Sequence, residues 1–237
     1  MNILGLRLLN KLSSIAFPKV CVCCGRENTR QQRKLCSFCL QERFQDANPH
    51  NAPASGDTLL PNGVIFQHAL WQFDKGGDLQ DLLHLLKYER LTAVGVDLGR
   101  KLGERSRKHP LLNEYLSQDN TVLLPVPLHY LKLRYRGFNQ AFKVARGFQE
   151  AWPDLEICSL KSVVRSKNTR TQTGFSLKKR RQNMVDAFRV DDISAIKNKT
   201  VVIVDDVFTT GSTSFELART VLTSGAEAAG ILTVAQA

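Results

Sequence analysis

The run Val-Val-Ile-Val at residues 201–204 constrains the fold of this chain more than any other feature. No polar residue interrupts it, and such a run is typical of a strand that is buried on both faces of a parallel sheet. Asp205 and Asp206 follow directly, so we expect both acids at the point where the chain leaves the strand. Because like charges repel, sugar hydroxyls or a hydrated cation would be needed to make the pair tolerable.

Predicted strands and helices alternate along the rest of the chain. We expect two helices in residues 78–107 with a break near 90–92, a strand in 121–127, a helix in 139–152, a strand in 156–164, a helix from about Ser214 and a strand in 228–234. Such alternation builds a mainly parallel, twisted sheet that is flanked by helices. The sequence therefore predicts an α/β fold.

The chain divides into three regions by composition. They are residues 1–45, with an N-terminal helix and the cysteine cluster, residues 46–70, a linker or irregular segment, and residues 71–237, the main domain. The formal net charge of +11 indicates an anionic partner, which can be nucleic acid, an acidic membrane surface or a phosphate-rich small molecule. Polar residues interrupt the apolar N-terminal run too early for a membrane span, and no signal-peptide cleavage site follows it. We therefore expect a cytoplasmic protein with reduced cysteines.

Two Cys-x-x-Cys pairs near the N-terminus have the spacing of a metal site. Their four thiolates, which suit a tetrahedral ion, come from Cys21, Cys24, Cys36 and Cys39. We interpret the cluster as a structural zinc site, with a redox pair or an iron–sulfur cluster as alternatives. Cys23 could replace Cys24 as a ligand, whereas Cys158 falls in a predicted strand and is interpreted as a core thiol.

The residues after the acid pair predict a phosphate-binding turn. Thr213 and Glu216 have the spacing of a capping box, so we expect a helix to begin there. The amides and hydroxyls that would face a phosphate at this helix N-terminus belong to Thr209, Thr210, Gly211, Ser212 and Thr213. A ribose could donate its vicinal hydroxyls to Asp205 and Asp206 while its phosphate occupies the turn. The pattern therefore fits a ribose 5-phosphate.

This strand, acid pair and Thr-Gly-Ser-Thr turn resemble the phosphoribosyl pyrophosphate motif of type I phosphoribosyltransferases. The resemblance implies that fold and binding of phosphoribosyl pyrophosphate with magnesium. It places the pyrophosphate loop after an earlier strand, at Pro127, Lys132, Arg134, Arg136 and Gly137. It also implies that an acid-free segment between 165 and 183 closes over the site as a lid, with Arg165, Gln172, Arg180, Arg181 and Asn183.

The chain also resembles the ComF/GntX family nearly from end to end. The resemblance rests on the cysteines, the Leu-Leu-Lys-Tyr-Glu segment at 85–89, the basic segment at 125–140 and the Arg-Arg-Gln-Asn segment from 180. It implies a zinc-ribbon-like N-terminus on a phosphoribosyltransferase domain and a link to DNA uptake or use. Lys179 and Phe175 depart from the usual family residues and leave the lid strongly basic. His84 lies in an apolar helical stripe with Lys87, and we interpret it as structural.

Two functions follow from these patterns. One is an enzyme that transfers ribose 5-phosphate to a nitrogen nucleophile and releases pyrophosphate with magnesium. The other is a non-catalytic accessory module that binds single-stranded nucleic acid or a partner in competence. Aromatic residues near the basic segments suit either base stacking or the core: Tyr130, Tyr135, Phe138 and Phe175.

Overall fold

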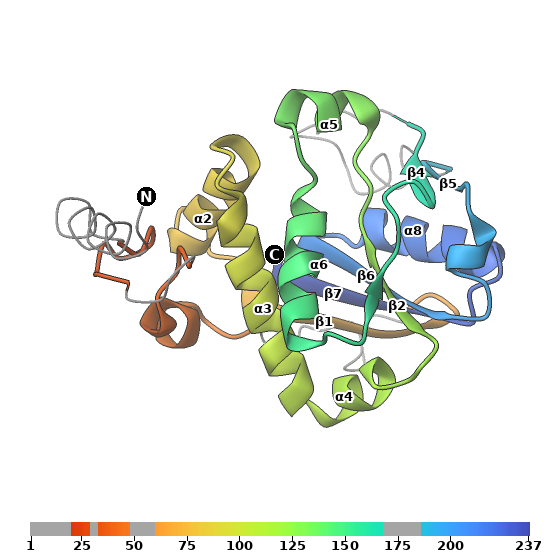
Figure 1. Cartoon of the computed structure of the whole chain (residues 1–237), viewed down its shortest axis with the longest axis horizontal. Helices are drawn as coiled ribbons and strands as arrows, with labels where there is room; N and C mark the ends of the chain where they lie inside the picture. The colour runs from red at the N-terminus through yellow and green to blue at the C-terminus, as the bar shows by residue number, and fades with distance from the viewer. Residues whose placement is uncertain (1–19, 29–32, 48–59, 168–185) are drawn as a thin grey trace, which may run out of the picture.

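A computed structural model of the chain describes residues 20–28, 33–47, 60–167 and 186–237 (Figure 1). The N-terminal helix that we expected within residues 1–45 falls largely in residues 1–19, outside the described ranges. Among the described helices, none has both the length and the apolar character that a membrane crossing requires.

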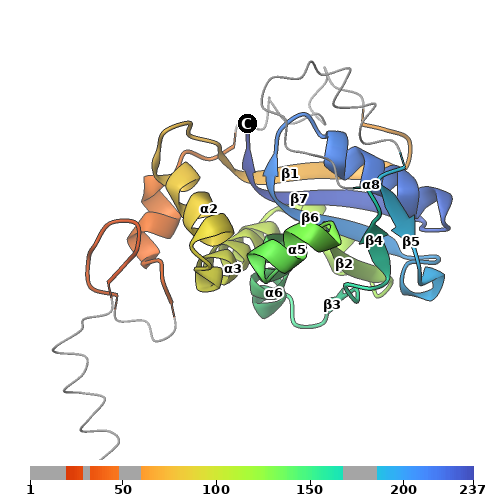
Figure 2. The ribbon, with the colours of Figure 1, turned by 90° about the horizontal axis from the view of Figure 1, so that it is seen from above.

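The core of the molecule is a five-stranded parallel sheet with helices on both faces (Figures 1 and 2). The strands, in spatial order, are β1 (Val64–Gln72), β7 (Ala228–Gln236), β6 (Thr200–Phe208), β2 (Thr121–Pro125) and β3 (Glu156–Ile157). Val202 and Val204 of β6 pack into the core under the helices α3 and α6, while Val201 and Ile203 pack on the opposite face with α8. The predicted α/β fold and the doubly buried strand are therefore confirmed.

The helices divide between the two faces of the sheet. The main ones are α2 (Asp78–Tyr88), α3 (Thr92–Lys108), α4 (Pro110–Leu116), α5 (Tyr130–Arg136), α6 (Gln140–Ala151) and α8 (Ser212–Thr223), and short turns form η1 (Cys39–Arg43) and η3 (Ile193–Ala195). The predicted break between the first two helices is confirmed, and Arg90 lies there with a φ of 57°. Helices α3 and α6 pack closely at Gly99, which has no side chain. A Cβ at this position would lie 1.9 Å from the carbonyl oxygen of Val144.

The first strand of the sheet, β1, was not predicted from the sequence. We expected a linker up to residue 70, but β1 starts at Val64 and pairs with β7 as far as Gln72. The pattern was hard to recognise because Gln67 and His68 place polar groups inside the strand. Gln67 is nevertheless buried and donates to Oε1 of Gln236 on β7 at 3.5 Å. The sheet thus includes part of the segment that we assigned to the linker.

One predicted strand was wrong in detail. The strand expected in residues 156–164 is divided, because the chain turns at Ser159 and Ser162, whose backbones are joined by a 3.0 Å hydrogen bond. Its second part, β4 (Val163–Arg165), forms a separate antiparallel pair with β5 (Phe188–Val190). Between β3 and β4, Cys158 is buried as expected, and burial raises the pKa of its thiol to about 11.

The cysteine element, the described residues 20–28 and 33–47, is docked on the main domain. Asp97 of α3 is buried and accepts hydrogen bonds from the backbone amides of Lys34 at 2.6 Å and Leu35 at 2.9 Å. The guanidinium of Arg33 lies 3.3 Å from the same carboxylate. Leu35 and Phe44 join the core cluster that includes α3 and α6. A buried carboxylate of α3 is therefore one of the contacts that hold the element on the main domain.

Replacing this carboxylate should cost far more stability than replacing an exposed one. Asp97→Ala leaves the buried amide of Leu35 and the partly buried amide of Lys34 without an acceptor, so we expect a loss of about 3 kcal/mol in the free energy of unfolding, measured in urea. Asp78→Ala is the matched control, because its ion pair with Arg43 is about as exposed as an ordinary surface pair and is worth about 1 kcal/mol or less. Equal losses in the two variants would contradict the docking role of Asp97.

Candidate functional site

The acid pair lies inside β6 and not beyond its end. Asp205 and Asp206 are both buried, and Asp205 is paired in register with Thr233 of β7. The strand continues to Phe208, so our expectation that the chain leaves the strand at the acids was wrong. Pairing with β7 extends the strand beyond the apolar run. The backbone amide of Asp206 donates to Oδ1 of Asp205 at 2.9 Å, which orients the carboxylate of Asp205.

A lysine from α2 pairs with this acid pair. The Nζ atom of Lys87 forms an ion pair with Oδ2 of Asp206. Burial, followed by the charge of Asp206, raises the pKa of Asp205 well above its usual value. Burial opposes ionisation of Asp206, but the charge of Lys87 together with hydrogen bonds to Asp205 and Lys87 outweighs it and lowers the pKa of that carboxyl. The pKa values of the two adjacent carboxyls are therefore shifted in opposite directions.

Sequence reasoning placed Lys87 in an apolar helical stripe and gave it no role. The sequence does contain a signal, because Lys87 follows the buried Leu83 by four residues and so lies on the inward side of α2. A lysine on such a face needs a partner, since an unpaired buried ammonium is costly. Its partner is more than a hundred residues away along the chain, and only the fold reveals it.

The turn after β6 leads directly into α8. Gly211 has a φ of 71° and precedes the helix, and a Cβ at this position would lie 2.4 Å from the ring of Phe215. The hydroxyls of Thr210 and Ser212 lie 2.8 Å apart, and the amide of Ser212 donates to Oγ1 of Thr210 at 3.4 Å. Thr209 is exposed and Thr213 half-buried. Polar groups therefore gather around a tight glycine turn at the N-terminus of a twelve-residue helix.

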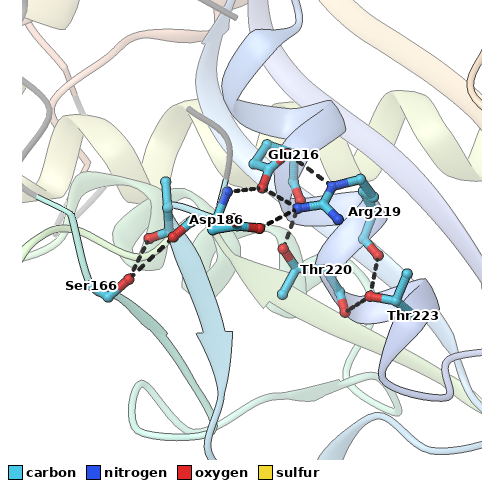
Figure 3. Close-up of polar contacts among 7 residues, drawn as sticks. Ser166, Asp186, Glu216, Arg219, Thr220 and Thr223 are labelled. Carbon is cyan, nitrogen blue, oxygen red and sulfur yellow. Dashed lines mark hydrogen bonds and ion pairs between the residues drawn. The ribbon is translucent and has the colours of Figure 1, made fainter. Parts of the chain in front are cut away.

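The predicted capping box is wrong. Helix α8 begins at Ser212 and not at Ser214, and the described residues give it no side-chain cap. Glu216 instead accepts a hydrogen bond from the backbone amide of Asp186 at 2.7 Å, and Arg219 pairs with both acids (Figure 3). The left-handed Gly211 allows the tight entry into the helix.

The network around Glu216 also anchors the boundaries of the predicted lid. The hydroxyl of Ser166 donates to the carbonyls of Asp186 at 3.5 Å and Ala187 at 3.3 Å, so described residues from before 168 and after 185 lie together here (Figure 3). Arg219 of α8 holds the carboxylate of Asp186 at 2.9 Å. The lid residues Gln172, Arg180, Arg181 and Asn183 lie outside the described residues, and their role stays a prediction.

The basic segment after β2 forms the short helix α5. Pro127 is buried before it, and Gly137 ends it with a φ of 82°. The side chain of Asn139 begins α6 by accepting from the amide of Phe142 at 3.3 Å, as expected for a residue that opens this helix. Among the predicted cations of α5, Lys132 and Arg136 are half-buried, whereas Arg134 is exposed to solvent.

Positive charges from different elements surround the acid pair. Burial lowers the pKa of Arg165 at the end of β4, and the nearby Asp205 opposes this effect. Burial, followed by the charges of Arg165 and Arg136, lowers the pKa of Lys132. The fold thus places Lys87 and Arg165 beside the acid pair, with Arg136 near Lys87 and Lys132 near Arg165. Such a cluster can hold a ligand that has sugar hydroxyls at one end and phosphate charge at the other.

The four predicted metal-ligand cysteines form one cluster. The sulfur atoms of Cys21, Cys24, Cys36 and Cys39 all lie within 4.8 Å of one another. Two of the separations are 3.9 Å, from Cys21 to Cys39, and 3.7 Å, from Cys24 to Cys36. A tetrahedral ion with Zn–S bonds of about 2.3 Å requires sulfur–sulfur distances of about 3.8 Å. The cluster is therefore compatible with a structural zinc ion, and the described group includes Cys24 and not Cys23.

Metal analysis of variants should distinguish these ligands. We expect one zinc ion per chain in protein purified without chelator, and loss of the metal from the variant with Cys36→Ser and Cys39→Ser, because two of four thiolates are removed. Cys23→Ser is the matched control and should keep the metal. Zinc that survives the double substitution, or that is lost from the control, would contradict the assignment. Iron with sulfide in place of zinc would indicate an iron–sulfur cluster.

Comparisons with known proteins agree with this fold. Residues 133–237 match the family model of the phosphoribosyl transferase domain, so the carboxyl-terminal part of the chain is of the phosphoribosyltransferase class. The chain is 38% identical over 237 residues to Competence protein F of Haemophilus influenzae, and the alignment covers 96% of this chain and 95% of that protein. The chain therefore belongs to the ComF family, and its parallel sheet with flanking helices is the type I phosphoribosyltransferase fold.

Other similarities are weaker. The chain is 29% identical over 221 residues to DNA utilization protein YhgH of Escherichia coli, covering 88% of this chain and 86% of that protein. A solved structure of the allosteric regulatory enzyme of purine biosynthesis superimposes with a TM-score of 0.36 and 18% identity, over 58% of this chain and 25% of that chain. This structural similarity is too low to support an argument about function.

Proposed function

We propose that the chain binds phosphoribosyl pyrophosphate and transfers its ribose 5-phosphate to a nitrogen nucleophile. The observation that carries this proposal is the order of chemical groups along β6 and α8. A buried acid pair is followed within a few residues by a tight glycine turn at a helix N-terminus, Arg165 of β4 lies near the pair, and Lys132 of α5 lies near Arg165. The phosphoribosyl transferase domain match over the same residues supports it.

Each part of the ligand has a matching group in the chain. The ribose hydroxyls would bond Asp205 and Asp206, and the 5′-phosphate would bond the amides and hydroxyls of residues 209–213. Lys132, Arg136 and Arg165 would hold the pyrophosphate. Magnesium, when bound with the ligand, supplies further positive charge at the pyrophosphate.

The proposed transfer requires little proton chemistry from the chain. The bond between the ribose C1 and the pyrophosphate oxygen breaks, and its electron pair leaves with pyrophosphate. A bond from the nucleophile's nitrogen to C1 forms, and that nitrogen loses one proton. Positive charge develops on the ribose ring during this step, so the ionised Asp206 beneath the ring would stabilise it. The chain's contribution would be mainly positioning and electrostatic stabilisation.

Binding should depend on the acid pair. The variant with Asp205→Asn and Asp206→Asn is expected to bind phosphoribosyl pyrophosphate with magnesium about tenfold more weakly or worse, measured by calorimetry, because charge-assisted bonds to the ribose are lost. The chain offers a matched control in Asp191→Asn with Asp192→Asn, another adjacent pair of acids, which is exposed and lies apart from β6. A folded Asp205/Asp206 variant with unchanged affinity would remove the pair from the ligand site.

A second function is favoured by the surface of α5. None of its seven described residues is buried, and Tyr130 and Tyr135 are 65% and 82% exposed beside Lys132 and Arg134. Exposed aromatic rings among cations suit stacking on single-stranded nucleic acid. The names Competence protein F and DNA utilization protein YhgH of the relatives support a role of this chain in DNA uptake or use. This role requires no catalysis, and it would make the chain an accessory module.

One tyrosine variant separates the two functions. If α5 binds single-stranded DNA, Tyr130→Ala with Tyr135→Ala should weaken that binding at least about fivefold, since base stacking is worth about 1–3 kcal/mol per base. The same variant should bind phosphoribosyl pyrophosphate normally, because neither ring belongs to the acid-pair site. The measurement is fluorescence anisotropy with an oligonucleotide at fixed salt, with calorimetry as the control. Unchanged DNA binding would count against the accessory function through α5.

A further inference from the structure

The ion pair between Lys87 and Asp206 differs from the exposed ion pairs of the described chain. Its lysine and aspartate side chains are 25% and 6% exposed, whereas the side chains of Arg43 and Asp78 are 38% and 40% exposed. An exposed pair contributes little, but a pair that is largely removed from water is strongly coupled. Losing one partner of such a pair leaves an uncompensated charge in the interior.

The position of Lys87 also decides where a metal ion could bind. Its Nζ atom lies directly against Oδ2 of Asp206, and Oδ1 of Asp205 already accepts from the amide of Asp206. A divalent cation on Oδ2 of Asp206 would have to displace the ammonium group. An ammonium carries three donors, so a lysine that is bonded to Asp206 can also donate to a ligand oxygen. The acid pair thus has a cation supplied by the protein itself.

We propose that Lys87 is a further binding residue of the acid-pair site, where its ammonium group is the fixed counter-cation of Asp206 and allows the ribose end of the ligand to bind without a divalent metal. This inference rests on the proposed function, since it concerns the same site. It assigns magnesium to the pyrophosphate end of the ligand and the ammonium group of Lys87 to the ribose end. Helix α2, which the sequence motif of the site does not include, becomes part of the site.

The test uses ribose 5-phosphate, which lacks the pyrophosphate, and compares calorimetric titrations in EDTA and in magnesium chloride. The wild-type chain is expected to bind it with less than about a threefold difference between the two conditions. Lys87→Met keeps the aliphatic stem and removes the charge, so it should lose about tenfold or more in EDTA and recover part of the loss with magnesium. Lys75→Met changes an exposed lysine just before α2 and should behave as wild type.

The outcomes separate the inference from the proposed function. Wild-type binding that requires magnesium overturns the role of Lys87 but leaves the ribose-phosphate site intact. A folded Lys87→Met variant that binds as tightly as wild type in EDTA overturns it as well. If the wild type binds no ribose 5-phosphate under either condition, the proposed function is contradicted, because the acid pair and the turn then do not bind this part of the ligand.

A measurement without ligand then decides whether Lys87 is the counter-cation. Lys87→Met, Asp206→Asn and the double variant are compared in urea unfolding as a double-mutant cycle. The double variant is expected to lose clearly less stability than the two single losses together, because removing both partners leaves no unpaired buried charge. Strictly additive losses would overturn the pairing, and with it the inference.

Discussion

The burial of β6 on both faces is the constraint on which the site depends. A central parallel strand needs apolar side chains above and below it, and 201–204 supplies them to the two core clusters in alternation. The same strand then carries Asp205 and Asp206 into an environment that disfavours charge. The pKa of Asp205 is raised there, whereas Asp206 pairs with Lys87, which offsets part of the cost of its charge. The acid pair and the apolar residues that pack into the core thus lie on one continuous strand.

The sequence predicted those parts of the fold and site that depend on local patterns. The apolar run of β6, the glycine turn and the two cysteine pairs are short-range features, and the structure has all three. Strand β1 was missed because it carries the polar Gln67, whose side-chain amide donates to Gln236, a partner that only sheet pairing brings near. The position of Lys87 in the site was missed for the same reason. A polar residue on an apolar face can be interpreted only when its distant partner is known.

The cysteine element is joined to the rest of the molecule through backbone groups. Asp97 accepts the amides of Lys34 and Leu35, and these two residues lead directly to Cys36. An amide donor is present in nearly every residue, so neither side chain needs to be polar for the contact to form. This explains why no pattern in the N-terminal sequence indicated a docking surface. In the sequence, Asp97 is a single polar residue within an amphipathic helix, and only the structure shows that it is buried.

The spatial order of the strands has a consequence for how the protein is made. β1 has only β7 as its described neighbour in the sheet, and β7 also separates β1 from β6. During synthesis, β1 therefore cannot pair in the sheet until residues 228–236 have left the ribosome. An extended apolar segment without its neighbour is a site for mispairing between nascent chains. Pairings so distant along the chain also slow folding. The interval between translation of the first and last strands is when this chain most needs a chaperone.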